Sequence, residues 1–168
     1  MLVVHRKCAI PRAPEATLVL PFAERERSRV RGATTMGEAI AILLPRGMRI
    51  AAGDILEAED GRAVAVVAAV EALHEARSDD ATTLARAAFH LGNRHAAVEI
   101  GSGRLRFTTD DVLAALVRQL GLQVERIDAP FHPEPGAYAR DAHGHGTGTI
   151  HEYATGAHSH GTQESTGR

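Results

Sequence analysis

The chain has 168 residues, with 19 lysines and arginines against 21 aspartates and glutamates. This balance gives a net charge of −2, and with no tryptophan, two tyrosines and four phenylalanines it predicts no nucleic-acid partner. A single cysteine, Cys8, excludes an internal disulfide framework and a cysteine-built zinc site, and we interpret it as a small apolar strand residue. No apolar run is long enough for a signal peptide or a bilayer span, so we expect no membrane association and a soluble, cytoplasmic protein.

Residues 1–70 are patterned as short strands between turn residues, which predicts a small all-β sandwich or barrel-like domain. The turns at Pro45–Gly47 and Asp60–Gly61 separate apolar runs, and the second is a strong hairpin signal. The stretch GEAIAILL alone could also form a helix. The first predicted strands are MLVVHRK (1–7), TLVLPF (17–22) and a charged edge strand within ERERSRVRGA (24–33).

A different pattern begins near residue 71. In DDATTLARAAFHL (79–91), Leu84, Ala88 and Leu91 share one helical face, Asp79 or Asp80 can cap the start, and Gly92-Asn93 ends the helix. Two strands, AAVEI and RLRF, follow around a glycine-rich turn. A second helix begins at TTDD, where we expect Thr108 or Thr109 to be the cap, and it ends at Gly121.

Two more strands complete this region, VEALHEAR (70–77) before the first helix and LQVERIDA (122–129) after the second. The order is then β-α-β-β-α-β, the split pattern of a ferredoxin-like domain. The expected fold class is therefore α+β, with a β-rich, peptide-binding-like domain at 1–70 and a ferredoxin-like domain at 71–141.

Residues 142–168 are dominated by Gly, Thr, Ser and His, and such a segment cannot offset its ordering entropy by burial. We expect a disordered tail. Neutral imidazole suits Ni, Cu, Zn and Fe, and the two H-x-H pairs on glycine-rich backbone favour metal binding over an incidental composition. The tail ligands we predict are His143, His145, His151, His158 and His160.

His95 lies at a structured position, after the helix stop and before a strand. Taken alone, it is more typical of a strand-entry histidine with one hydrogen bond than of a ligand. One imidazole does not hold a divalent ion tightly. If a twofold dimer placed residue 95 near its axis, two fixed imidazoles and the tail would together form a site that can take up and release a divalent metal ion.

Several motifs resemble the urease accessory protein E family. They are FHLGNRH before an apolar strand, LRFTTDDVL, QLGLQVERIDAPFHPEPGAYA with the His-containing tail, and upstream VRGATTMGEAIAILLPRGMRIAAGDILEAEDGRAVAVVAA. The similarity runs from about residue 28 to 141.

This resemblance implies a homodimeric nickel metallochaperone that delivers Ni(II) to apo-urease in concert with a urease-accessory GTPase. It also implies that His95 binds nickel at the dimer interface, that the tail adds further sites, and that His90 is an auxiliary ligand or, more commonly, a packed helix residue. Where some members carry histidines at the start of the second helix, this chain has Thr108-Thr109-Asp110-Asp111, so those peripheral sites should be absent, although Asp111 could offer an oxygen. Zn(II) or Cu(II) could also bind in vitro, since bare affinity favours copper over nickel.

Two alternatives remain open. A zinc hydrolase needs three rigid ligands and an open position, and the sequence has neither H-E-x-x-H nor a Ser-His-Asp pattern, so we expect no enzyme. A metal-independent adaptor would use the N-terminal domain to bind peptides, with the arginines around residues 25–31 as a docking surface.

Overall fold

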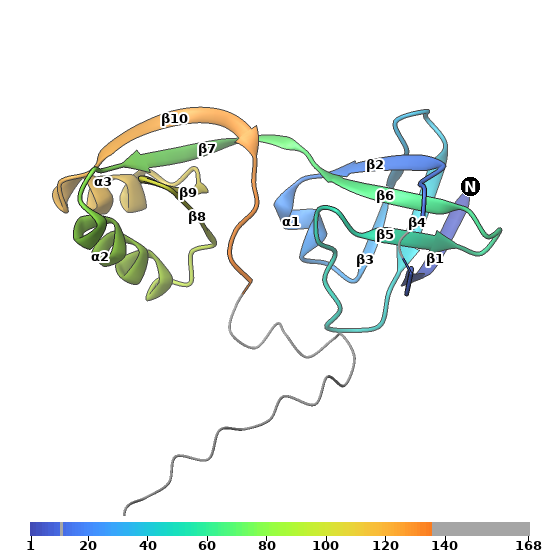
Figure 1. Cartoon of the computed structure of the whole chain (residues 1–168). Coiled ribbons are helices and arrows are strands. Elements are labelled where there is room, and N and C mark those ends of the chain that lie inside the picture. The colour runs from blue at the N-terminus through green and yellow to red at the C-terminus, as the bar shows by residue number, and fades with distance from the viewer. Residues whose placement is uncertain (11, 136–168) are drawn as a thin grey trace, which may run out of the picture.

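The computed structural model describes residues 1–10 and 12–135, which form two sheet-centred regions. The chain passes from the first region to the second at residue 69, and the segment after residue 130 returns toward the junction (Figure 1). The tail histidines predicted as ligands lie outside the described residues. In the described part, no helix is long and apolar enough to cross a membrane.

The N-terminal region is built around a six-stranded mixed sheet in the order β2-β6-β5-β1-β4-β3. The pairs β1–β4 and β2–β6 are parallel, and the other pairs are antiparallel. Its strands are β1 (Leu2–Lys7), β2 (Ala16–Leu20), β3 (Arg29–Ala33), β4 (Ala39–Leu43), β5 (Ile55–Ala58) and β6 (Ala63–Ala68). The predicted edge strand is confirmed, because β3 ends the sheet.

The alternating apolar residues of these strands meet in one core in which Val4, Ile42, Leu56 and Val64 are fully buried. The stretch GEAIAILL contributes β4 and is not a helix. One expectation was wrong: the run predicted to be β as far as Phe22 ends at Leu20, and helix α1 (Phe22–Arg25) follows. Pro21 precedes α1 and has no N–H to donate to a sheet ladder, so the strand stops there.

The C-terminal region is an antiparallel four-stranded sheet in the order β10-β7-β9-β8. Its elements follow the predicted succession of strand, helix, strand, strand, helix, strand. They are β7 (Val70–Arg77), α2 (Ala81–Gly92), β8 (Val98–Gly101), β9 (Arg104–Thr108), α3 (Asp111–Gln119) and β10 (Gln123–Pro130).

Both helices cover the same face of this sheet and bury their apolar residues against it (Figure 1). Asp80 caps α2, as predicted, by accepting hydrogen bonds from the backbone of Thr82 and Thr83. The cap predicted for α3 was wrong. Asp110, and neither Thr108 nor Thr109, accepts from the backbone of Val112 and Leu113. Thr108 instead continues β9 opposite Leu73, so the strand runs longer than expected.

The two regions meet at an apolar junction. Phe131, which follows β10 and is fully buried, packs edge-to-face on Phe22 of α1 with the ring centroids 5.3 Å apart. The buried guanidinium of Arg25 donates to the Phe131 carbonyl oxygen at 2.6 Å, and the Phe22 amide donates to a carboxylate oxygen of Glu71 at 2.9 Å. Desolvation lowers the pKa of Arg25 from its ordinary value, which is the cost of burying this contact.

Candidate metal centre

His95 ends the three-residue turn that leaves α2 and leads toward β8. Its amide donates to the Gly92 carbonyl at 2.9 Å, and the Ala96 amide donates back to the Leu91 carbonyl at 3.2 Å. Leu91 is fully buried in the core beneath the helices. The turn is thus fastened to the rigid part of the domain, while the His95 side chain is exposed.

The backbone of His95 is in the left-handed region, with φ of 56°. It is the only residue other than glycine with positive φ in the described part of the chain. For a residue with a Cβ atom this conformation costs about 1–2 kcal/mol. The expectation that Gly92-Asn93 ends the helix is correct, but the residue that adopts the left-handed turn is the histidine itself. Strain of this kind is often retained where a side chain has a function.

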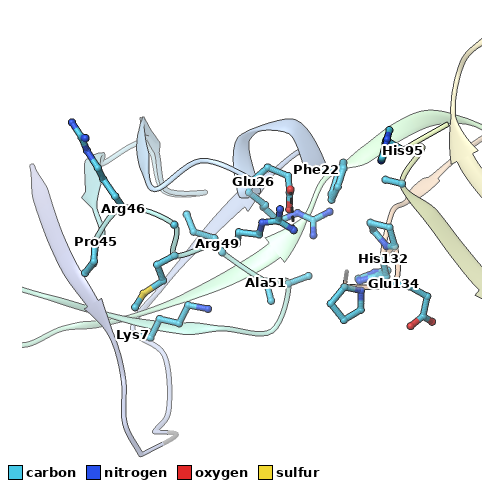
Figure 2. Close-up of a pocket in the computed structure, with 18 of the residues that line it drawn as sticks. Lys7, Phe22, Glu26, Pro45, Arg46, Arg49, Ala51, His95, His132 and Glu134 are labelled. Carbon is cyan, nitrogen blue, oxygen red and sulfur yellow. Dashed lines mark ion pairs between the residues drawn. The ribbon is translucent and has the colours of Figure 1, made fainter. Parts of the chain in front are cut away.

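His95 lines a groove between the two regions, together with residues of α1 and of the loop after β4 (Figure 2). The basic side chains of Lys7 and Arg46 are on the N-terminal side of this groove, whereas the imidazoles of His95 and His132 are on the C-terminal side. Lys7 is already neutralised by Asp54, at 2.7 Å. Arg25 and Arg49 line the groove as well, and Arg49 is paired with Glu26 at 3.3 Å. The groove therefore has imidazole nitrogens on one side and basic side chains, two of them paired with carboxylates, on the other.

His132 is the one histidine of this groove that the sequence did not single out. It follows the buried Phe131, and its amide donates to a carboxylate oxygen of Glu99 at 2.8 Å. Two residues later, the Glu134 amide donates to the Val98 carbonyl at 2.8 Å. The His132 side chain is exposed, although the backbone on both sides of it is held by these contacts.

The Glu99 carboxylate belongs to a charged network on the face of the sheet opposite the helices. Arg106 bridges Glu75 and Glu99 through hydrogen bonds of 2.7 and 3.2 Å. Burial by itself would raise the pKa of Glu75, but hydrogen bonds from Arg106 and Arg77 outweigh it and hold the pKa below its usual value. Glu75 therefore stays charged, and Glu99, which is paired with Arg106, anchors the backbone of residue 132 by accepting from its amide.

The remaining histidines of the described part play other roles. His90 is half-buried on α2 with its ring 5.5 Å from that of Phe89, and it does not line the groove with His95. His74 is 1% exposed in β7, and neither ring nitrogen has a hydrogen-bond partner among the described residues. Asp111, considered as an oxygen donor, is engaged by Arg126 at 2.9 Å.

Within residues 1–10 and 12–135, no group of three or more His, Cys, Asp or Glu side chains is arranged to hold a metal ion. One subunit thus presents exposed imidazoles but no complete ligand set in its described part. A divalent transition metal at His95 would need donors from elsewhere, either a second copy of the chain or the tail.

These features define a class of protein: a two-domain α+β protein with exposed imidazoles beside an interdomain groove. Residues 3–69 match the family described as UreE urease accessory protein, N-terminal domain, and residues 71–164 match its C-terminal domain. The chain therefore belongs to the UreE urease accessory protein family.

Curated relatives support this assignment along most of the chain. The urease accessory protein UreE of Cupriavidus necator is 49% identical over 146 residues, which cover 86% of this chain and 75% of the relative. The UreE of Burkholderia vietnamiensis is also 49% identical over 146 residues, covering 86% and 72%. That of Paraburkholderia xenovorans is 44% identical over 158 residues, covering 92% and 69%.

Proposed function

We propose that this protein is a nickel metallochaperone that delivers Ni(II) to apo-urease while the urease metallocentre is assembled. The observation that carries the proposal is His95, an exposed imidazole held in a strained turn of a UreE-family chain, with no hydrogen bond or ion pair to its ring within the described residues. A side chain kept in this conformation without an intramolecular partner is available to an external ligand. Imidazole nitrogen is a suitable ligand for nickel.

The nickel site is proposed to form between two subunits of a homodimer. Phe89 on α2 and Ile100 on β8 are 63% and 55% exposed, and they belong to the two elements that flank the His95 turn. β8 is also an edge strand of its sheet. A second copy packed on this surface by twofold symmetry would cover both apolar side chains and would bring two His95 residues together.

His143, His145, His151, His158 and His160 are proposed to supply further ligands from the tail. Histidines on glycine-rich backbone can follow an ion as it enters or leaves a site at fixed imidazoles. The same ligands would accept Zn(II) or Cu(II) in vitro, so selection of nickel rests on cellular supply and docking to the client.

The domain roles complete the proposal. Residues 71–141 form a ferredoxin-like metal-binding and dimerisation domain, supported by the β-α-β-β-α-β succession and the strand order β10-β7-β9-β8. Residues 1–70 are the domain that docks on partners, and 142–168 are the tail. The partners are the urease apoprotein and the urease-accessory GTPase in the cytoplasm. The protein catalyses no reaction of its own.

Nickel titration by calorimetry and native mass spectrometry of the full chain tests the site. His95→Ala should abolish the tight ion shared by the dimer, leaving only weak binding, while His5→Ala should bind as the unaltered protein does. His5 is the matched control because its exposed ring is paired with Glu59 at 2.7 Å and does not line the groove. Unchanged tight binding by His95→Ala would refute the interfacial site. Binding to urease that survives chelation of all metal would favour a metal-independent adaptor.

A further inference from the structure

His132 and His95 come from segments 37 positions apart in the sequence, and both line the groove between the two regions (Figure 2). His132 also borders a second, shallower hollow formed by Ala52, Val67 and Pro130, so it lies at the rim where the two regions meet. An ion that approaches His95 along the junction would pass this imidazole. The proximity results from the way β10 returns along β7 to the junction and continues past Ala97, which packs near Phe131.

The backbone that carries His132 is unusually well fixed for a segment without helix or strand. Residue 131 is fully buried, the residue 132 amide is bound to Glu99, and the residue 134 amide is bound to Val98. Pro133 restricts the backbone between these anchors. Because the backbone is held on both sides, the exposed ring gives up only its own rotational freedom on binding a ligand. Preorganised donors of this kind are what a metal site requires.

The groove around His132 is lined by both basic and acidic side chains, and Lys7 and Arg49 are paired with Asp54 and Glu26. Glu134 is exposed on the same segment and lines the groove, whereas no hydrogen bond or ion pair to the His132 ring is found within residues 1–10 and 12–135. The groove has a volume of about 1160 Å³. A divalent ion with six waters needs roughly 200 Å³, at roughly 30 Å³ per water molecule, so a hydrated ion can enter.

We propose that His132 is a second metal-binding residue, at which a borderline divalent cation such as Ni(II) is held in the groove before it reaches His95. This rests on the proposed function for the identity of the cargo, and it adds a loading position within the same subunit. Glu134 serves as the accompanying oxygen donor. The bound ion loses waters to the His132 imidazole first and then exchanges this nitrogen for His95.

Histidine-resolved chemical protection tests this directly in the full chain. Diethyl pyrocarbonate acylates free, unprotonated imidazoles, and a nitrogen bound to Ni(II) is protected; peptide mass mapping then reports each histidine separately. We expect Ni(II) in excess, which fills both positions, to protect His132 and His95 and to leave His5 reactive. Protection of His95 without His132 would overturn this inference and leave the proposed function standing. Protection of His132 without His95 would support the inference and remove the proposed site, and protection of neither would overturn both.

A pair of variants then measures what His132 contributes. In His132→Gln, protection of His95 after Ni(II) is added should develop about tenfold more slowly, the lower end of the loss caused by removing a supporting residue from a metal site. His5→Gln, the matched control, should leave that rate unchanged. An equal rate of His95 protection in His132→Gln and the unaltered protein would overturn the loading role.

Discussion

The two sheets of the protein use their faces differently. The six-stranded sheet gathers its apolar residues into one continuous core that contains no histidine. The four-stranded sheet has an apolar face under α2 and α3, while its other face carries the network of Glu75, Arg106 and Glu99 and then the apolar junction at Phe131. His132 and His95 lie where this second face meets the N-terminal region. The comparison teaches that the two imidazoles are positioned differently: His132 is held by a hydrogen bond from the polar sheet face, and His95 by backbone hydrogen bonds of a turn anchored at the buried Leu91.

The largest expected effect comes from breaking the junction. Phe131→Ala removes a fully buried ring that packs on Phe22, and it should lower the free energy of unfolding by about 4 kcal/mol. Phe131→Leu keeps most of the volume and should cost about 1 kcal/mol. Denaturant titration monitored by circular dichroism measures both. A loss of under 1 kcal/mol in the alanine variant would show that the two regions are not held together by this contact.

Removing a charge from the polar face of the four-stranded sheet should lower the free energy of unfolding slightly less, and the size of this loss should depend on pH. Glu75→Gln removes one of the two carboxylates that Arg106 bridges, and because Glu99 still pairs with Arg106 we expect a loss at the lower end for a buried pair, about 3 kcal/mol at pH 7. Because the folded-state pKa of Glu75 is lowered, its contribution is complete above the unfolded pKa of about 4.3 and is lost as the pH falls through the lower folded value. The difference between variant and parent should therefore shrink in acid.

The neighbouring strand offers a matched control for this change. Glu125 is exposed on β10 directly opposite Glu75. Glu125→Gln removes a like charge across the pair and should be neutral or slightly stabilising. A stability gap between Glu75→Gln and the parent that stays constant from pH 7 to pH 3 would contradict the assigned charge state.

A smaller loss of stability is expected when the N-terminal cap of α3, on the helix-covered face, is removed. Asp110→Ala removes the cap of α3 and should destabilise the protein by about 1 kcal/mol. Thr109→Ala, at one of the two positions predicted from the sequence, should have almost no effect. Thermal unfolding of the two variants decides between the two residues, and equal shifts in Tm would argue against Asp110 as the cap.

The smallest effect has the opposite sign. His95→Gly relieves the left-handed backbone at φ 56°, and after the greater chain entropy of glycine in the unfolded state is subtracted it should stabilise the protein by about 0.5 kcal/mol. The same variant should lose tight nickel binding. His95→Ala keeps the strain and is the comparison in both measurements. If His95→Gly is less stable than His95→Ala, the turn is not strained in solution.

The secondary structure could be predicted to a large extent because it depends on local spacing. The stripe of Leu84, Ala88 and Leu91 predicted α2, and the turn residues around Asp60-Gly61 correctly separated β5 from β6. The errors fell at element ends. Pro21 stopped β2 earlier than expected, and Asp110 took the capping role because β9 pairs with β7 as far as Thr108. Strand pairing is a non-local contact, so the sequence near an end does not reveal where pairing stops.

The features of the candidate site also divide into those that local sequence determines and those that the tertiary structure determines. The sequence by itself determined the composition of the tail, the family motif that ends in His95, and the alternating patterns of both sheets, since each depends on residues close together in the chain. Only the tertiary structure decided that His95 adopts a left-handed backbone, that His74 is buried, and that His132 shares a groove with His95. These results follow from contacts between distant segments, above all the return of β10 along β7, and such contacts are set by packing across the whole fold.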